Sequence, residues 1–486
     1  MSAKKPIYIT TTLPYVNANP HIGHALEMIQ ADVYARTHRI LGHEVFFSTG
    51  VDEHGQKVFN KASKEGIEVK AYVDQYAKRF ENLRDILGLS FDSFIRTTSP
   101  LHKKAAQEMW KRVYDSGDIY KKEYKGLYCV GCEAFIKEKD LKEGECPDHP
   151  GQVPQEVIEE NYFFKFSKYQ NELLEYLSRK DSVAPEFRRQ DLISFASLGL
   201  EDISISRRAE KMPWGISVPG DDEHVMYVWF DALTNYLSTL GWPLSTGATE
   251  GDFTKFWERG FTIQCAGKDQ MRFQSLLFQA MLFSAGIKRT DKIFYHGFIT
   301  SGGVKMSKSI GNVIDPLVLQ SEYGTDAFRY YLLRHIHPSE DSDFTEEKFK
   351  ESYNAHLANG IGNLTSRIMK MAVEYDLEYE DLLSREEIWN HPENTAYVDA
   401  LKNFEFNHAL DIVWGLIQEA DEYIAREEPF KVVKENPERA KKIVWNVLVK
   451  LHMVAVLLEP ILPDTAEKIQ SAIEKKEKPE NLFVRK

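Results

Sequence analysis

Ile7-Tyr8-Ile9-Thr10 opens a stretch that continues through Pro20-His21-Ile22-Gly23-His24 to Val45-Phe46-Phe47-Ser48. The first and last segments are β-branched and aromatic, which is typical of buried strands. Pro20 suits the first position of a helix, and apolar residues then repeat at helical spacing as far as Gly42, a natural helix stop. This order of strand, helix and strand predicts a right-handed βαβ unit of a parallel sheet.

The start of this predicted helix has the chemistry of a phosphate site. Its first N–H groups lack partners within the helix, and its dipole end is positive. His21 and His24 can donate hydrogen bonds to phosphoryl oxygens, and Gly23 between them allows a ligand to approach the backbone. The alternative is a chance His-Ile-Gly-His sequence at a helix cap.

The composition is that of an ordinary globular protein. The 486 residues allow two to four domains, and 43% are apolar and 28% charged. No signal peptide or membrane span is recognised, so we expect a cytoplasmic protein without a membrane partner. The net charge of −13 argues against non-specific coating of polyanions, but it permits a shaped RNA partner that is read through base edges and a local basic face.

The loop Val51–Gly55 follows the second predicted strand. Ligands of open parallel sheets bind beyond the carboxyl ends of strands. Asp52 is therefore placed to meet a cationic group of a substrate, while His54 and Gly55 shape the loop. The alternative is that Asp52 caps the next helix.

Two ligand pairs indicate a metal site. Cys129-x₂-Cys132 and Cys146-x₂-His149 are separated by 13 residues, which is the pattern of a closed, structural Cys₃His zinc knuckle. The alternative is a set of structural cysteines without a metal. Clustering of three of the four cysteines favours a reducing compartment.

Two further stretches indicate a second half of the nucleotide-binding fold. Tyr227–Leu233 is read as a strand that runs into a helix carrying Tyr236. Trp229 and Tyr236 could wall an apolar pocket, although core packing is the alternative. Phe261–Cys265 is read as a strand, after which Gly267 and Asp269 suit contact with a nucleoside.

Gly302–Ser309 is a glycine-hinged loop with lysines at positions 305 and 308. Ammonium groups on such a loop can close over a triphosphate and stabilise developing charge. A lone basic loop is usually solvated surface, but this one occurs together with the two histidines in one α/β chain.

This combination resembles the class I aminoacyl-tRNA synthetases and, over essentially the whole chain, the methionyl-tRNA synthetase family with a single zinc knuckle. The signatures are His21–His24 and Lys305–Ser309, supported by Thr12–Tyr15, Thr49–Gly55, Tyr227–Ala232 and Gly362–Arg367. The resemblance implies an α/β fold: a Rossmann-type domain with a parallel sheet, interrupted by a small zinc-binding insertion and followed by a helical bundle. The expected divisions are 1–117 and 213–300 for the two Rossmann halves, 118–212 for the insertion, 301–345 for the lysine loop and stem-contact segment, and 346–486 for an anticodon-binding bundle.

The implied reaction joins methionine to tRNA(Met) in two steps, through methionyl-adenylate and with release of pyrophosphate. The resemblance assigns catalysis to His21, His24, Lys305 and Lys308, which also bind ATP together with Gly23, Gly267 and Asp269. It assigns methionine binding to Leu13, Tyr15, Asp52, Trp229, Ala232, Tyr236 and Gln274. It assigns the anticodon to Asn363, Arg367 and Phe430, and structural zinc to Cys129, Cys132, Cys146 and His149.

The sequence departs from the family pattern at three positions. Gln270 and Gln274 stand where an aliphatic residue and a histidine are usual, and Phe430 stands where a tryptophan is common. We expect the Gln274 amide to bond a neighbouring Tyr hydroxyl. The expected partners are tRNA(Met), methionine and ATP with Mg²⁺, and one structural Zn²⁺ is expected. We expect the chain to be a monomer. The alternatives are a catalytically altered tRNA-binding paralogue and a small-molecule adenylating enzyme.

Overall fold

The computed structural model describes residues 4–130, 134–136, 138–142, 144–147, 151, 153–243, 252–305, 314–379 and 381–486. The chain forms two compact units. Unit 1 comprises Met1–Pro20, His43–Leu83 and Phe91–Tyr295, and unit 2 comprises His21–Gly42, Arg84–Ser90 and His296–Lys486.

A six-stranded sheet in the order β3-β2-β1-β12-β13-β7 forms the centre of unit 1. β1 pairs in parallel with β2 on one side and with β12 on the other, so their carboxyl ends share one edge. The strands expected at Ile7–Thr10, Val45–Ser48 and Phe261–Cys265 are therefore confirmed. The strand bounds are β1 Ile7–Thr10, β2 Val45–Val51, β3 Ser93–Arg96, β7 Val183–Ala184, β12 Phe261–Gly267 and β13 Lys292–His296.

Helices and a large apolar core complete this part of unit 1. The core includes the buried side chains of Tyr8, Trp110, Phe230 and Trp257. The helices are α2 Gln56–Glu65, α3 Val69–Glu81, α5 Pro100–Asp115, α6 Gln170–Ser178, α7 Glu186–Ser197, α8 Val228–Leu233, α9 Asn235–Ser238 and α11 Phe278–Ser284.

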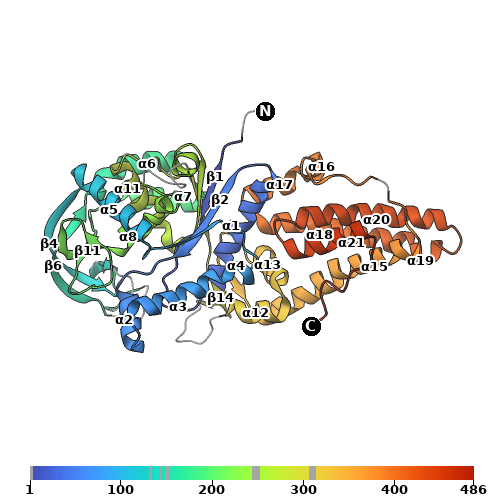
Figure 1. Ribbon diagram of the computed structural model, residues 1–486, viewed down its shortest axis with the longest axis horizontal. Helices are drawn as coiled ribbons and strands as arrows, with labels where there is room; N and C mark the ends of the chain where they lie inside the picture. The colour runs from blue at the N-terminus through green and yellow to red at the C-terminus, as the bar shows by residue number, and fades with distance from the viewer. Residues whose placement is uncertain are drawn as a thin grey trace. The chain divides into compact units, whose positions relative to one another are not determined.

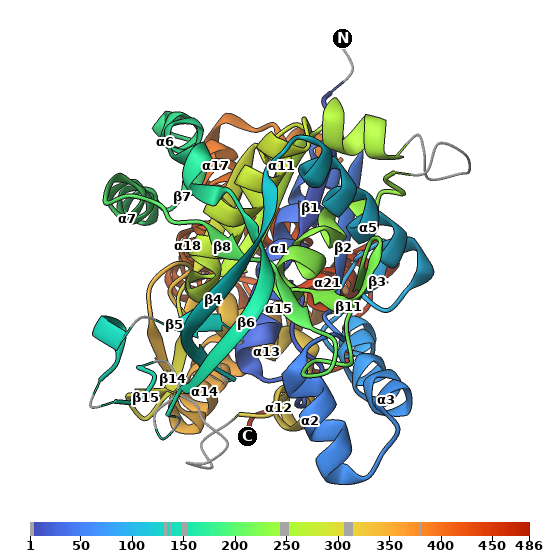
Figure 2. The ribbon, with the colours of Figure 1, turned by 90° about the vertical axis from the view of Figure 1, so that its left-hand side faces the viewer.

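Two long antiparallel strands dominate the inserted segment of unit 1. β4 (Ile119–Cys129) and β6 (Gln155–Phe164) pair from Ile119–Phe164 to Tyr128–Gln155, and Figure 2 shows them side by side. The short strands β5 (Ala134–Ile136) and β8 (Ile203–Ser204) flank this pair. A second antiparallel sheet contains β9 (Ser206–Arg208), β10 (Ser217–Val218) and β11 (Asp221–Met226).

The strand predicted at Tyr227–Leu233 is wrong. β11 ends at Met226, and the apolar run that follows is helix α8, with the N–H groups of Phe230 and Asp231 donating to the Tyr227 carbonyl at 2.9 and 3.1 Å. The run is buried almost throughout, and a short, continuously apolar segment has no periodicity that separates a buried strand from a buried helix. The preceding strand also belongs to an antiparallel sheet, so the next strand of the parallel sheet after this run is β12.

Along the chain, helix α1 (Ile22–Ile40) joins β1 to β2, and it belongs to unit 2. It starts two residues later than expected, because His21 is the N-cap, with extended backbone (φ −130°, ψ 171°), and Pro20 precedes it. The helix ends at the expected glycine, since Gly42 has a left-handed φ of 78°.

The described remainder of unit 2 contains one three-stranded sheet, β15-β14-β16, and is otherwise built from helices and their connections. Helices α15, α18, α20 and α21 pack side by side as a bundle, as expected (Figure 1). The bounds are β14 Ile299–Ser301, β15 Val304–Lys305, β16 Ser342–Phe344, α12 Pro316–Tyr323, α13 Thr325–Arg334, α14 Glu346–Ser352, η6 Tyr353–Gly362, α15 Asn363–Glu374, α16 Arg385–Trp389, α17 Thr395–Lys402, α18 Phe406–Glu427, α19 Pro429–Val432, α20 Pro437–Leu458 and α21 Pro463–Lys475.

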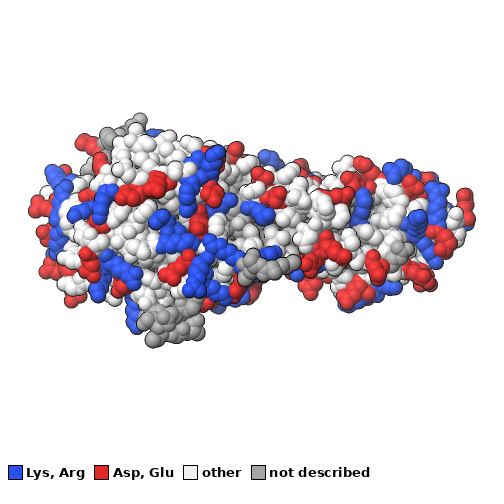
Figure 3. All heavy atoms as spheres, turned by 90° about the horizontal axis from the view of Figure 1, so that it is seen from above, with Lys and Arg blue, Asp and Glu red and all other residues white. Residues whose placement is uncertain are grey.

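The surface of the bundle carries charges of both signs. Figure 3 shows acidic and basic side chains interleaved over it, so the net negative charge is not a uniform acidic coat. Within the described ranges, none of the helices is both long enough and apolar enough to span a bilayer.

Candidate active site

The start of α1 holds two stacked imidazoles. The rings of His21 and His24 lie 3.7 Å apart between centroids, with their planes 22° from parallel. The Gly23 N–H donates to Nδ1 of His21 at 3.1 Å, and the His21 N–H donates to Nδ1 of His24 at 3.2 Å. The two side chains thus form a reciprocal cap that satisfies N–H groups at the helix start.

This cap determines which ring nitrogens can serve a ligand. Because Nδ1 of each ring accepts a hydrogen bond, the proton of each neutral ring is on Nε2, which is then a donor. Burial, together with the neighbouring His21 and His296, holds the pKa of His24 well below its ordinary value. His24 is therefore a neutral donor at physiological pH.

A glycine hairpin carries the first lysine of the predicted phosphate loop. β14 and β15 pair antiparallel, with Thr300 opposite Lys305, and the connecting Gly302 and Gly303 have φ values of 63° and 75°. Two successive positive φ values suit a tight hairpin turn and favour glycine at both positions. The Gly303 N–H also donates to Oδ1 of Asp343 at 2.8 Å.

The segment that follows this loop returns to the start of α1. The Ile22 N–H donates to the Ile314 carbonyl at 3.3 Å, which brings the chain just beyond the lysine signature to the first residue of the histidine helix. Lys305 is described as part of β15, whereas Lys308 lies outside the described residues.

In unit 1, Asp52 lies directly beyond β2 and forms a parallel bridge with Tyr15. The side chain of Asp52 is 3% exposed. Its Oδ1 accepts the Thr97 hydroxyl at 3.3 Å and the His54 N–H at 3.2 Å. These donors hold a buried carboxylate at the edge of the sheet where ligands of such folds bind.

An aromatic wall stands next to this carboxylate. The ring of Tyr15 lies 6.2 Å from that of Trp229 in an edge-on arrangement, and Trp229 stacks on Phe273 at 4.0 Å. Ala232 lies one turn after Trp229 on α8, and its side chain is buried. Phe273 was not singled out from the sequence.

Two buried donors of this region have no protein acceptor among the described residues, Nε1 of Trp229 and Nε2 of Gln274. A buried N–H without a partner costs free energy, so a ligand or water that accepts from it is favoured. The hydrogen bond expected between Gln274 and a Tyr hydroxyl is not found within the described chain. The neighbouring Ser275 bonds the Tyr295 hydroxyl instead, at 2.6 Å.

The other predicted ligand contacts of unit 1 differ in exposure. Leu13 is half-buried in the loop after β1, and Asp269 is exposed just beyond Gly267, where β12 ends. Tyr236 is 2% exposed and packs on Phe278 at 5.3 Å, inside the apolar core.

In the bundle, Asn363 and Arg367 lie one turn apart near the start of α15. Nη1 of Arg367 pairs with Oδ1 of Asp421 on α18 at 3.3 Å, and Asn363 is exposed. Phe430 is 47% exposed on the short helix α19. An exposed aromatic ring and polar groups of this kind suit contact with unstacked bases.

Comparisons with known proteins cover nearly the whole chain. The model of class I tRNA synthetases (M) matches residues 7–152 and 149–369, and that of the anticodon-binding domain of methionyl-tRNA ligase matches residues 386–482. The methionine–tRNA ligase of Clostridium perfringens is 40% identical over 487 residues, which is 97% of this chain and 74% of the relative. The chain belongs to the methionyl-tRNA synthetase family.

Further relatives agree with this assignment. The methionine–tRNA ligase of a Nostoc species is 39% identical over 96% of this chain and 89% of its own. A solved Mycobacterium tuberculosis methionyl-tRNA synthetase in complex with methionyl-adenylate has a TM-score of 0.87 at 35% identity, covering 96% of this chain and 93% of that one. The predicted family, the ligase class and the α/β fold with its helical C-terminal part are thereby confirmed.

Half of the metal site expected in this synthetase lies in the described residues. Cys129, at the end of β4, and Cys146 are each 1% exposed. Cys132 and His149 lie outside the described residues, and within the described part of the chain no group of three potential ligands comes together.

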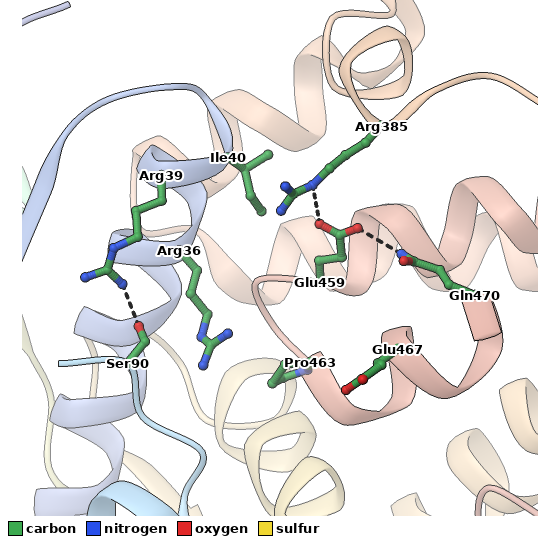
Figure 4. A pocket seen from close by; sticks show the side chains of 9 residues that line it. All are labelled: Arg36, Arg39, Ile40, Ser90, Arg385, Glu459, Pro463, Glu467 and Gln470. Carbon is green, nitrogen blue, oxygen red and sulfur yellow. Dashed lines mark hydrogen bonds and ion pairs between the residues drawn. The ribbon is translucent and has the colours of Figure 1, made fainter. Parts of the chain in front are cut away.

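A cavity of about 640 Å³ in unit 2 of the synthetase is distinct from all predicted site residues. Its polar side chains largely bond one another: Arg39 bonds Ser90, and Glu459 bonds both Arg385 and Gln470 (Figure 4). Arg36 pairs with Asp32 outside the wall, so most charged groups of this cavity already have a protein partner, and we interpret it as a structural feature.

The sequence did not reveal the partners of Asp231. Its carboxylate lies between His54 and His102, and all three side chains are buried. The available signal was a single carboxylate within the apolar run Tyr227–Leu233, because a charge in a buried segment requires partners.

Proposed function

We propose that this chain carries the catalytic residues of a methionine–tRNA ligase, in the roles that its sequence predicts. Family membership supports the overall reaction. The single observation that carries the residue assignment is the paired imidazole cap of α1, at a helix start whose Ile22 N–H donates to the Ile314 carbonyl beyond the lysine loop.

The amino-acid substrate binds in unit 1. Asp52 accepts the ammonium group, since a buried carboxylate fixed by two donors is an acceptor of constant position. Leu13, Tyr15, Trp229, Ala232, Tyr236 and Gln274 surround the thioether. A polarizable, unbranched side chain suits an edge-on aromatic pair such as Tyr15 and Trp229.

In the first step a carboxylate oxygen of methionine attacks the α-phosphorus of ATP, and the bond to the pyrophosphate oxygen breaks. The Nε2–H groups of His21 and His24 donate to phosphoryl oxygens, while Lys305 and Lys308 offset the negative charge of the leaving group. The nucleophile is already ionised, so no general base is needed. Magnesium bound to ATP would add charge neutralisation.

The nucleoside of ATP contacts Gly23, Gly267 and Asp269. Gly267 ends β12 at the carboxyl edge of the sheet, where a backbone without a side chain admits a flat base or sugar. The exposed carboxylate of Asp269 is available to ribose hydroxyls.

In the second step the terminal adenosine of tRNA(Met) attacks the methionyl carbonyl and releases AMP. Asn363 and Arg367 hydrogen-bond anticodon bases, and Phe430 provides a stacking surface in place of the usual tryptophan. The loss of the indole N–H leaves stacking as the contribution of this position.

A structural zinc ion would be held by Cys129, Cys132, Cys146 and His149. The burial of the two described cysteines fits this role, because a closed tetrahedral thiolate site excludes water. Cys146→Ser, with metal content read by elemental analysis, should lose the zinc and lower the melting temperature. Full zinc content in that variant would remove the assignment.

We also propose a cytoplasmic monomer. Sedimentation at micromolar concentration should give the mass of one 56.1 kDa chain. A dimer would refute the monomer without affecting the reaction.

The decisive experiment is exchange of labelled pyrophosphate into ATP, run separately with each of the twenty amino acids. Methionine alone should support rapid exchange, and charging should then require tRNA(Met). A binding paralogue would show no exchange, and an adenylating enzyme for another small molecule would show none with methionine.

A further inference from the structure

Asp231 forms the centre of a buried cluster in unit 1. One carboxylate oxygen, Oδ2, lies 2.7 Å from Nδ1 of His54, and the other, Oδ1, lies 2.7 Å from Nε2 of His102. The three residues are at most 2% exposed. Nδ1 of His102 in turn lies 3.0 Å from the Ser238 hydroxyl.

The protonation of this cluster follows from its geometry. Burial alone would raise the pKa of Asp231, but the two imidazoles more than offset it, so the group is a carboxylate. A carboxylate only accepts, so Nδ1 of His54 and Nε2 of His102 are the donors. Both oxygens are thereby satisfied without a water molecule.

The cluster joins elements that carry the amino-acid site. The main-chain N–H of His54 donates to Oδ1 of Asp52 at 3.2 Å. Asp231 itself lies on α8, between Trp229 and Ala232 in sequence. Ser238 lies on α9, which carries Tyr236.

The loop around His54 has other anchors, on its backbone and on the side chain of Glu53, whose carboxylate accepts from Nε of Arg96 at 2.7 Å. Nε1 of Trp214 donates to the Glu53 carbonyl at 2.6 Å, and the Glu53 N–H donates to the Thr97 hydroxyl at 2.9 Å. The bond from His54 to Asp231 differs from these anchors, because it joins a side chain of the Asp52 loop to the helix that carries Trp229.

We propose that the His54–Asp231–His102 cluster holds the Asp52 carboxylate at a fixed distance from the aromatic wall of Tyr15 and Trp229. The ammonium group and the side chain of the substrate then bind at the same time. This inference rests on the proposed role of Asp52. His54, His102 and Asp231 are positioning residues, because they act through Asp52 and α8.

The physical reason is the cost of leaving a buried charge unpaired. Loss of one donor leaves an oxygen of the buried Asp231 carboxylate without a hydrogen bond. The Asp52 loop and helix α8 then move until another donor or a water molecule reaches that oxygen. A displacement of about 1 Å in a positioning group can cost about a hundredfold in a reaction. The displacement affects recognition of the ammonium group first, because His54 shares its loop with Asp52.

The test compares two amide side chains of different length at position 54. Asn places its amide nitrogen where Nδ1 of histidine lies, so His54→Asn retains the donor to Asp231. His54→Gln retains an amide but places it one bond further out. The readout is the inhibition of pyrophosphate exchange by L-methioninol and by 4-(methylthio)-1-butanol, which differ only in the ammonium group and cannot be adenylated.

The ratio of the two inhibition constants measures recognition of the ammonium group. A charge-assisted hydrogen bond predicts that methioninol binds the unaltered protein about 10- to 100-fold more tightly. We expect His54→Asn to keep this ratio within threefold and His54→Gln and Asp231→Ala to lower it at least tenfold. Inhibition by the butanol should change less than threefold in all three.

A matched control separates positioning from general destabilisation. His224 is fully buried, and its Nδ1 pairs with Oδ2 of Asp221 at 3.0 Å in the sheet of β9, β10 and β11. His224→Ala should lower the melting temperature and leave the inhibitor ratio unchanged.

The outcomes are distinguishable from failure of the proposed function. If Asp52→Asn abolishes the ratio while His54→Gln and Asp231→Ala retain it, positioning by the cluster is refuted and the ammonium site stands. If Asp52→Asn retains the ratio, the assignment of Asp52 fails first. If His54→Asn and His54→Gln lower the ratio equally, the bond to Asp231 is not the cause and the proposal falls.

Discussion

Replacing His21 by Asn separates the helix cap that this side chain forms from its proposed role as a donor to the nucleotide. Nδ1 of His21 caps α1 by accepting the Gly23 N–H at 3.1 Å, and Nε2 is the proposed donor. Asn is among the best N-cap residues, and its Oδ1 can take over the cap. It has no atom that reaches the position of Nε2.

The magnitudes of the two roles differ enough to be resolved. Loss of an N-cap typically costs about 1 kcal/mol of stability. Loss of a donor to a charge that develops in the transition state costs about 2.7–4 kcal/mol, or about 10²- to 10³-fold in rate. His21→Ala should show both losses, and His21→Asn only the second.

Urea unfolding and methionine-dependent pyrophosphate exchange measure the two quantities on the same samples. His21→Asn should unfold within about 0.5 kcal/mol of the unaltered protein and lose at least a hundredfold in exchange rate. Exchange within tenfold of normal would refute the donor role. Equal stability of the Ala and Asn variants would refute the cap.

Three further predictions address other parts of the chain. Gly23→Ala should favour the helix by about 0.5–1 kcal/mol and yet slow pyrophosphate exchange, because the new Cβ would lie 3.0 Å from Cε1 of His21; unimpaired exchange would show that the ring can move without loss. Asp326 accepts the Thr465 N–H at 2.6 Å, and burial raises the pKa of its carboxyl group to about 6 from 3.8. The contribution of this group to the free energy of unfolding is therefore fully present below about pH 4 and is lost as the pH rises through 6. This change amounts to about 3 kcal/mol. Urea unfolding between pH 4 and 7 should therefore show a shallower fall in stability for Asp326→Asn than for the unaltered protein. Parallel curves for the two proteins would contradict the assignment. Arg367→Ala should raise KM for tRNA in aminoacylation at least tenfold and leave pyrophosphate exchange unchanged, while Lys370→Ala, which removes an exposed charge from the same helix, should do neither.

Local sequence was sufficient to predict those elements and motifs whose chemistry or periodicity lies in neighbouring residues. Ile7–Thr10 and Val45–Ser48 were recognised because β-branched and aromatic residues fit a buried strand. The long helices α18 and α20 were recognised because their apolar faces repeat at helical spacing. The two signatures were recognised because their glycines, histidines and lysines are adjacent in the chain.

Predictions failed where a local pattern fits two structures. Tyr227–Leu233 is apolar on all sides because it is buried on all sides, so the helix α8 could not be distinguished from a strand. Pro20 suits the first helical position, but the helix starts after His21, because Nδ1 of His21 accepts the Gly23 N–H and the His21 N–H donates to Nδ1 of His24.

The sequence by itself therefore determined the family and the reaction, since their signatures are motifs a few residues long. Only the tertiary structure decided which distant residues meet: β1 lies beside β12, and Asp231 lies between His54 and His102. The physical reason is that a buried charge or a sheet edge takes whichever partner the fold brings to it, and nothing in the local sequence specifies a partner far along the chain.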